Sequence, residues 1–356
     1  MNTTKTLKLF FTKQLLHWHQ NENLRALPWK QETDPYKIWL SEIILQQTRA
    51  EQGLPYYLKF TQQYPTVEEL ANAPDEEVFR MWQGLGYYNR CKNLLHTART
   101  ITTNLKGRFP DTHSEILALK GIGEYTAAAI ASFAFGLPYA VVDGNVHRVL
   151  ARFFGIETPV DSSEGKKEFQ TLASELLDKE NSAAYNQAIM DHGATVCTPA
   201  APKCNECIFQ KNCLAFQKEA VSLFPVKSKS IKVRKRYFHY LLLRHENKLW
   251  LKKRTEKDIW QNLYEPFLIE HDHKLNVEEL TQHPTFGLIK KAALSYTGSS
   301  TQRLTHQQIE ATFFTMNVAA TEHVKTENGE WIPIELLKKI PFPKTLVSFL
   351  EKNFYF

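Results

Sequence analysis

Residues 117–148 read LALKGIGEYTAAAIASFAFGLPYAVVDGNVHR, and this stretch decides the fold that we expect for the N-terminal part of the chain. It predicts an apolar helix, a glycine turn, a second apolar helix, and an acidic turn that opens a third helix. Gly121 and Gly123 allow a close backbone approach, so amides at the next helix start can face a phosphate oxygen. From these residues alone, a plain tight turn and a plain N-cap at Asp143 remain open alternatives.

The composition indicates a globular protein with at least two domains, because 356 residues with 43% hydrophobic content exceed one typical domain. No apolar run approaches the ~20 residues that span a bilayer, and the N-terminus lacks the apolar region of a signal peptide. We therefore expect a cytoplasmic, nucleoid-associated protein with no membrane partner.

The basic excess is confined to residues 221–236, VSLFPVKSKSIKVRKR, which carry basic residues and no acidic ones. Without helical periodicity, and with proline and serine present, this segment predicts an interdomain linker. It would attract an acidic polymer, or it would simply keep the linker soluble.

A lone acid, Glu42, interrupts the apolar helical run over residues 36–48. An acid on the apolar side of a helix either has a raised pKa or faces a cleft, and both suit a general acid. A surface carboxylate remains the alternative. Gln47 and Thr48 end this helix with groups that can reach base edges, and Trp29 in the preceding loop can stack on a base or fill the core.

Residues 84–88, GLGYY, place two tyrosines after a glycine turn. Planar side chains on a turn can wedge between base pairs, which makes Tyr87 a candidate DNA contact. Core packing of these tyrosines is the alternative.

Four of the five cysteines lie close together, at Cys197, Cys204, Cys207 and Cys213. This clustering favours metal ligation over a disulfide framework in an intracellular protein. The short, unequal spacings suit an iron–sulfur cluster at least as well as zinc.

Taken together, these motifs resemble the endonuclease III, or helix-hairpin-helix, superfamily of DNA glycosylases, and within it the MutY-type adenine glycosylases. The resemblance is carried by Leu27-Pro28-Trp29, residues 39–48, residues 84–88, Val142-Asp143-Gly144-Asn145-Val146, residues 186–191 and the cysteine spacing. It implies an all-α helix-hairpin-helix glycosylase domain over residues 1–220, whose loop 197–213 binds a [4Fe-4S] cluster through the four cysteines.

The resemblance also implies roles for individual residues. Glu42 would protonate the adenine leaving group, Asp143 would stabilise the cationic sugar, and Tyr125 and Asn145 would orient these acids. Bifunctional relatives carry a lysine where this chain has Tyr125, so Schiff-base formation and strand cleavage are not expected. The DNA and substrate contacts would come from Trp29, Lys30 and Gln187 around the extruded base, Gln47, Thr48 and Tyr87 near the gap in the duplex, and Gly121 and Gly123 at a phosphate. Relatives often have arginine or glutamine in place of Lys30, and His147 also departs from the pattern.

The C-terminal residues 237–356 predict an α+β domain, since residues 237–244 and 248–254 alternate as a strand hairpin. Residues 258–267 resemble Nudix-like domains, but residues 275–300 lack the glutamate cluster of a hydrolytic Nudix helix, so we expect a binding module. Leu304-Thr305-His306 matches the loop, usually Phe-Ser-His, with which MutY-type proteins recognise 8-oxoguanine. Thr305 and His306 are therefore candidate lesion contacts, with an incidental loop histidine as the alternative.

These observations predict a monomeric, monofunctional base-excision-repair glycosylase that removes adenine paired with 8-oxoguanine or guanine in double-stranded DNA. One alternative is an endonuclease III-like glycosylase and AP lyase that acts on oxidised pyrimidines. The other is a lesion-binding protein without catalytic activity.

Overall fold

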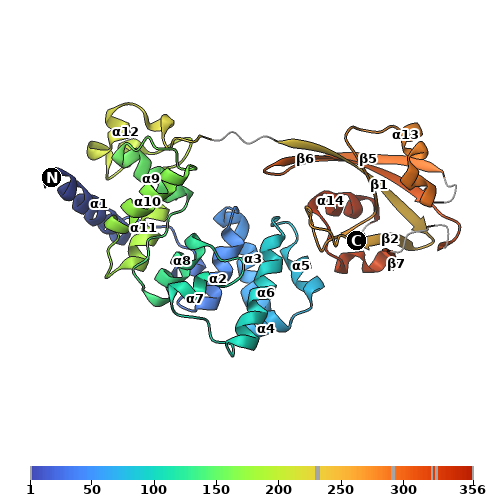
Figure 1. Cartoon of the computed structure of the whole chain (residues 1–356), viewed down its shortest axis with the longest axis horizontal. Coiled ribbons are helices and arrows are strands. Elements are labelled where there is room, and N and C mark those ends of the chain that lie inside the picture. Colours follow the sequence, from blue (N-terminus) through green and yellow to red (C-terminus); the bar gives the residue numbers. More distant parts are fainter. Residues whose placement is uncertain (1, 229–232, 290–292, 322–323, 325–327, 355–356) are drawn as a thin grey trace. The chain divides into compact units, whose positions relative to one another are not determined.

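The chain divides into two compact units (Figure 1). The computed structural model describes residues 2–228, 233–289, 293–321, 324 and 328–354. Residues 1–71 and 93–229 form the first unit, and residues 72–92 and 230–356 form the second. No helix among the described residues is long and apolar enough to cross a membrane.

The first unit is helical. Its α-helices are α1 (Asn2–Asn21), α2 (Pro35–Leu45), α3 (Ala50–Gln63), most of α4 (Val67–Asn72) and of α6 (Asn89–Asn104), α7 (His113–Leu117), α8 (Glu124–Phe135), α9 (Gly144–Phe154), α10 (Ser163–Leu176), α11 (Ser182–Thr195) and α12 (Leu214–Gln217). Short 3-10 turns, η1 (Pro28–Gln31), η2 (Cys204–Glu206), η3 (Gln210–Asn212) and η4 (Val221–Leu223), connect them. The described part of this unit therefore confirms the predicted all-α fold.

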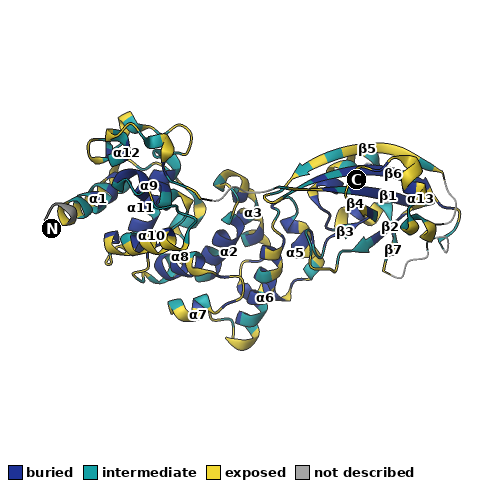
Figure 2. Ribbon diagram, turned by 45° about the horizontal axis from the view of Figure 1, so that its top comes forward, coloured by how far each residue is buried: buried dark blue, intermediate teal, exposed yellow. Residues whose placement is uncertain are grey.

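One hydrophobic core joins α1 to the cysteine loop, and Figure 2 shows the buried stretches of α9 and α11 in dark blue. Phe11 on α1 stacks on Phe209 of that loop, with ring centroids 4.6 Å apart, and also contacts Phe153 on α9. Burial of such rings favours folding by roughly 2 kcal/mol each. The loop that carries the cysteines is thus fixed to the helices that carry the candidate active site.

The predicted glycine hairpin joins α7 to α8. Gly121 has a φ of +82°, and a Cβ at this position would lie 2.6 Å from the Cβ of Asn93, so both the turn and the packing require glycine. Gly123 is the N-cap of α8 and is exposed. After α8 ends at the left-handed Gly136, Asp143 caps α9, so the three helices follow the predicted order.

The second unit contains a mixed sheet. Its strands are β1 (Arg234–His245), β2 (Lys248–Lys253), β3 (Tyr264–Glu265), β4 (Phe267–His271), β5 (Leu294–Arg303), β6 (Gln307–Asn317) and β7 (Glu330–Pro333). The strand order is β3-β2-β1-β6-β5, with β4 paired to β1 and β7 paired to β2, and β1 and β6 run parallel. The turn between β1 and β2 confirms the predicted hairpin.

Helices pack on both faces of this sheet. The helices α13 (Val277–Gln282) and α14 (Lys344–Phe354) accompany the 3-10 turns η5 (Pro284–Leu288) and η7 (Ile334–Lys339). Phe313 on β6 stacks on Phe349 of α14, with centroids 3.9 Å apart, while Leu241 and Phe314 belong to the core that includes Leu280 of α13. Consecutive side chains of β6 thus pack against helices on opposite faces of the sheet. This is the α+β arrangement expected from the sequence.

The observed boundaries differ from the predicted ones in three places. The predicted linker begins at residue 221, whereas Val221 and Phe224 pack into the core of the first unit. Residues 72–92, which include α5 (Asp75–Trp82), group with the C-terminal residues rather than with the helical unit. Within the second unit, Lys253 Nζ lies 2.6 Å from Glu76 Oε1, and the backbone N–H of Phe342 donates to Gln83 Oε1 at 3.1 Å.

The predicted linker also ends earlier than residue 236, because β1 begins at Arg234. Arg236 can enter the strand because Asp258 and Glu270 each pair with its guanidinium at 2.7 Å. Residues 229–232 of the linker lie outside the described residues.

Candidate active site

Glu42 is a buried acid in the middle of α2, with 6% of its surface exposed. Asp34 caps this helix by accepting the N–H of Tyr36 at 2.9 Å, and the apolar residues around Glu42 fold into the core. Burial raises the pKa of Glu42 to about 7; the Tyr125 hydrogen bond opposes this shift and the negative charge of Asp143 adds to it. Glu42 is therefore a carboxyl that can hold or release a proton near neutral pH.

Tyr125 lies in the first turn of α8, and its hydroxyl donates a hydrogen bond to the Glu42 carboxylate. Burial, followed by the charges of Glu42 and Asp143, raises the pKa of Tyr125 well above its usual value. The phenol thus stays protonated and serves as a fixed donor. The structure brings Glu42, Tyr125 and Asp143 together, as the sequence analysis expected.

Asp143 is both the N-cap of α9 and a member of this group. Its Oδ1 accepts the N–H of Val146 at 2.8 Å, and its Oδ2 accepts from Asn145 Nδ2 at 2.6 Å. Burial raises the pKa of Asp143, while these hydrogen bonds and the charge of Arg148 act in the opposite direction. Asp143 therefore receives more support for its charged form than Glu42 does.

Arg148 connects this turn to the end of α11. Its Nη2 donates to Asn145 Oδ1 at 2.8 Å and to the carbonyl of Gly193, and its Nε donates to the carbonyl of Cys197 at 2.7 Å. A Cβ at Gly193 would lie 2.7 Å from the Cβ of Asn145, so glycine permits this close approach. Arg148 was not singled out from the sequence, and an arginine within a helix gives no local signal of such a role.

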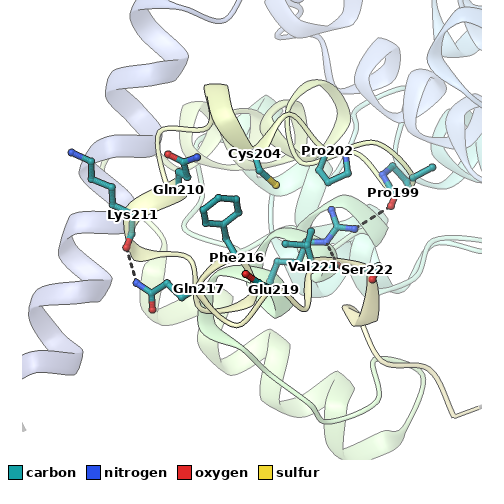
Figure 3. A pocket seen from close by; sticks show the side chains of 12 residues that line it. Pro199, Pro202, Cys204, Gln210, Lys211, Phe216, Gln217, Glu219, Val221 and Ser222 are labelled. Atoms are coloured by element: carbon teal, nitrogen blue, oxygen red, sulfur yellow. Dashed lines mark hydrogen bonds between the residues drawn. The ribbon is translucent and has the colours of Figure 1, made fainter.

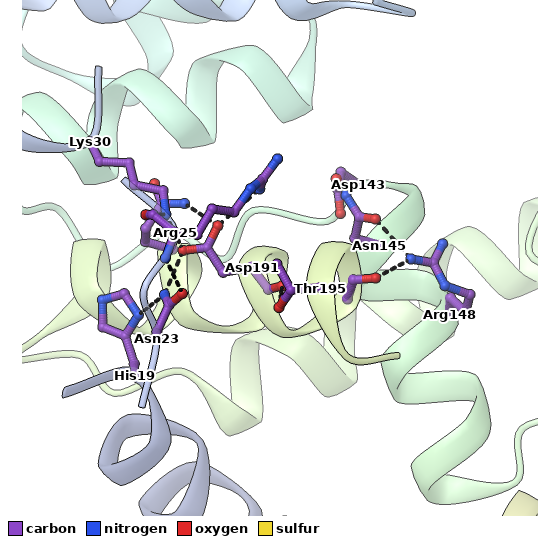
Figure 4. A network of polar contacts seen from close by, with 11 residues as sticks. His19, Asn23, Arg25, Lys30, Asp143, Asn145, Arg148, Asp191 and Thr195 are labelled. Atoms are coloured by element: carbon purple, nitrogen blue, oxygen red, sulfur yellow. Dashed lines mark hydrogen bonds and ion pairs between the residues drawn. The ribbon is translucent and has the colours of Figure 1, made fainter. Parts of the chain in front are cut away.

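Asp191, on α11, contacts two of the predicted substrate-binding residues, Lys30 and Gln187 (Figure 4). It is fully buried, and Lys30 Nζ lies 2.5 Å from its Oδ2, Arg25 Nη1 lies 3.0 Å from its Oδ1, and Gln187 Nε2 donates to Oδ1 at 3.2 Å. Desolvation lowers the pKa of Lys30, although the hydrogen bond from Lys30 to Asp191 opposes the shift. Lys30 and Gln187 are thus brought together through an acid that the sequence analysis did not select.

The remaining predicted residues of the first unit lie on its turns. Trp29 is half-buried and packs edge-on against Tyr57, with ring centroids 5.3 Å apart. Gln47 has a left-handed φ of 58°, which turns the chain sharply after α2, and the Thr48 hydroxyl donates to the carbonyl of Gln46. Gly121 and Gly123 are exposed at the hairpin.

In the second unit, the exposed Tyr87 meets the loop between β5 and β6. The hydroxyl of Tyr87 is hydrogen-bonded to that of Thr305. Both residues, together with His306, border a pocket of about 560 Å³. Thr305 and His306 are exposed, so their polar atoms can be reached from solvent.

The four cysteines surround one small cavity between α11 and α12. Arg152 Nη1 donates to Cys197 Sγ at 3.4 Å, and the backbone N–H of Phe209 donates to Cys207 Sγ at 3.4 Å. Four sulfurs facing one cavity, two of them with N–H donors, fit a thiophilic metal centre. The same loop borders an open pocket of about 890 Å³, lined in part by Cys204 and Phe216 (Figure 3).

Comparison with known proteins identifies both parts of the chain. Residues 40–178 match the HhH-GPD superfamily base excision DNA repair protein family, and residues 239–352 match the NUDIX domain family. A solved structure of a thermostable thymine-DNA glycosylase is 32% identical with a TM-score of 0.56, over 60% of this chain and 99% of that one. These matches confirm the predicted fold of each part.

Curated relatives narrow the family further. The adenine DNA glycosylase of Buchnera aphidicola subsp. Acyrthosiphon pisum (strain APS) is 35% identical over 257 residues, which cover 72% of this chain and 73% of that protein. The adenine DNA glycosylase of Buchnera aphidicola subsp. Schizaphis graminum (strain Sg) is 29% identical over 96% of this chain and 98% of that protein. The chain therefore belongs to the adenine DNA glycosylase family of base-excision-repair enzymes.

Proposed function

We propose that this protein removes adenine paired with 8-oxoguanine, and less readily adenine paired with guanine, from double-stranded DNA by acid-assisted hydrolysis of the N-glycosidic bond. The observation that carries the proposal is the buried group of Glu42, Tyr125 and Asp143, in which two acids have different hydrogen-bond partners. Two acids with different environments are what acid-assisted glycosidic cleavage requires.

Glu42 supplies the proton. With a pKa of about 7, a large share of Glu42 is protonated at neutral pH. Adenine leaves slowly as an anion, so the transfer of this proton to a ring nitrogen lets the base accept the electron pair of the breaking bond and depart neutral. Tyr125 holds the carboxyl of Glu42 in place.

Asp143 stabilises the positively charged sugar that remains after the base has left. Loss of the base leaves positive charge on the sugar, and a carboxylate close by lowers the energy of that cation until water adds to it. The bonds from Val146 and Asn145 keep Asp143 oriented for this role. Because Tyr125 cannot form an imine, the enzyme releases the base without cutting the strand.

Adenine must leave the duplex before Glu42 can reach it. We assign the walls of the base pocket to Trp29, Lys30 and Gln187, with Asp191 as the buried anion that holds the latter two. The exposed amides at Gly121 and Gly123 face a phosphate, and Gln47 and Thr48 lie at the gap left by the extruded base.

The second unit recognises the opposing base. Thr305 and His306 provide a hydroxyl and an imidazole beside Tyr87, whose exposed ring can stack on a base. The hydrogen bond between Tyr87 and Thr305 supports a shared role for the two predicted elements in reading 8-oxoguanine.

We assign the cysteine loop to a [4Fe-4S] cluster, bound by Cys197, Cys204, Cys207 and Cys213. When bound, this cluster supplies a redox-active iron centre that also crosslinks the loop. The chain's own contribution is Arg152, a buried cation that donates to Cys197 and to the carbonyls of Thr198 and Pro199. Its positive charge offsets part of the negative charge of four thiolates.

A single-turnover assay on duplexes with adenine opposite 8-oxoguanine, guanine, cytosine or thymine tests the proposal. We expect fastest excision opposite 8-oxoguanine, slower excision opposite guanine, and no covalent adduct on borohydride treatment. Efficient trapping on a duplex with an oxidised pyrimidine would favour the endonuclease III-like alternative. Tight binding without any excision would favour the lesion-binding alternative.

A further inference from the structure

The end of β4 and the turn that follows it carry three potential metal ligands that the glycosylase reaction does not use. One donor atom from each of His271, Asp272 and His273 lies within 4.8 Å of the others. All three belong to the second unit, which contains none of the four clustered cysteines.

The two histidine rings converge on one carboxylate oxygen. His271 Nδ1 lies 2.8 Å from Asp272 Oδ1, and His273 Nδ1 lies 2.7 Å from the same atom. Within the described residues, His271 Nδ1 is shielded from solvent yet makes no hydrogen bond of acceptable geometry. His273 Nδ1, by contrast, is hydrogen-bonded to Asp272 Oδ1. A shielded nitrogen that lies beside a carboxylate oxygen without a hydrogen bond is a donor that a cation bound to both atoms would satisfy.

A buried histidine on β1 holds this turn in shape. His239 Nε2 accepts the N–H of Leu275 at 2.9 Å, so the ring proton lies on Nδ1, which is 3.2 Å from the carbonyl of Ile269. One neutral imidazole thus fixes both ends of the segment that carries the three donors. A fixed backbone lowers the entropy cost of ordering the ligands around an ion.

Two neighbouring residues, Glu279 and His283, lie close to the three donors but are not counted among the ligands. Glu279 Oε1 lies 3.9 Å from His273 Nε2, so a carboxylate stands on the far side of the ring, as behind many metal-bound histidines. His283 is not a ligand in this arrangement: its Nδ1 accepts the N–H of Thr285 at 3.2 Å, which leaves its proton on Nε2.

We propose that His271, Asp272 and His273 bind a divalent zinc ion through two imidazole nitrogens and one carboxylate oxygen, with water completing the coordination. Two nitrogen donors favour zinc over magnesium or calcium, which prefer oxygen ligands. The site is open to exchange with solvent, since the Asp272 side chain is 87% exposed. The bound ion crosslinks the β4–α13 turn.

The test uses the full-length protein with iron loaded at the cysteine loop. Zn²⁺ is titrated by calorimetry, and the zinc-bound protein is measured by X-ray absorption. We expect one Zn²⁺ with a shell of nitrogen and oxygen at about 2.0–2.1 Å and without the sulfur distance of about 2.3 Å. The double variant His271→Gln/His273→Gln should bind Zn²⁺ at least about tenfold more weakly.

Asp272→Asn should weaken Zn²⁺ binding by a similar factor, and the exposure of Asp272 means that this variant keeps the fold. His96→Gln, which changes an exposed histidine on α6, is the matched control and should bind Zn²⁺ like the wild type. The proposal is overturned if Zn²⁺ does not bind, if its shell contains only sulfur, or if Asp272→Asn leaves the affinity unchanged.

Discussion

Replacement of Glu42 by glutamine should make the protein less active and, at alkaline pH, more stable. Glutamine keeps the shape of Glu42 but cannot deliver a proton, so the single-turnover rate should fall by about 10² to 10⁴. The opposite change in stability follows from the pKa of Glu42, which is raised from 4.5 to about 7 in the fold.

The sign and size of this effect come from proton linkage. The folded protein binds the Glu42 proton more tightly than the unfolded chain does, so the stabilising contribution is complete below pH 4.5 and is lost as the pH rises through about 7. Relative to a neutral side chain, the cost is about 1 kcal/mol at pH 5 and about 3 kcal/mol at pH 8. Glu42→Gln removes this cost, and its advantage over the wild type should grow between the two pH values.

Urea unfolding at pH 5 and pH 8, followed by helical circular dichroism, measures this difference. The control is Glu168→Gln, an exposed acid on α10, which should change neither the rate nor the pH dependence of stability. If Glu42→Gln shows the same stability difference from the wild type at both pH values, Glu42 does not have a raised pKa. Undiminished excision would remove it from the mechanism.

Three further predictions concern the other groups. Asp143→Asn should retain binding to a duplex with adenine opposite 8-oxoguanine while losing at least ~10²-fold in single-turnover rate, because a neutral amide does not stabilise the sugar cation; a rate within twofold of the wild type would exclude that role. Thr305→Ala combined with His306→Ala should reduce the ratio of excision opposite 8-oxoguanine to excision opposite guanine, measured in parallel assays, and an unchanged ratio would mean that this loop does not read the lesion. Anaerobically purified protein should show the broad visible absorbance of an iron–sulfur cluster, which Cys204→Ser should diminish, whereas colourless protein with bound zinc would contradict the cluster assignment.

The sequence identified Glu42 as a candidate catalytic acid but gave Asp191 no role of its own, although both are buried acids on helices. Glu42 interrupts a run with few other polar residues, so the sequence made it a candidate general acid, with a surface carboxylate as the alternative. Asp191 lies beside polar neighbours on α11, and its partners Asn23, Arg25 and Lys30 are more than 160 residues away in sequence. Only the fold shows that these charges meet.

Local sequence patterns also could not predict the boundaries between the two units. A count of charges placed Arg236 in the basic linker, whereas its backbone pairs with Ile309 of β6 and so places it in β1. Residues 72–82 have helical periodicity like the first unit, but contacts such as Lys253 to Glu76 group them with the second. Long-range pairing, rather than local propensity, decides both assignments.

The central claim is that a proton from Glu42 drives the departure of adenine, and the pH dependence of the wild-type single-turnover rate tests it most directly. On a duplex with adenine opposite 8-oxoguanine, the rate should fall about tenfold for each pH unit above about 7, the pKa of Glu42. A rate that stays constant between pH 6 and pH 9 would contradict the claim.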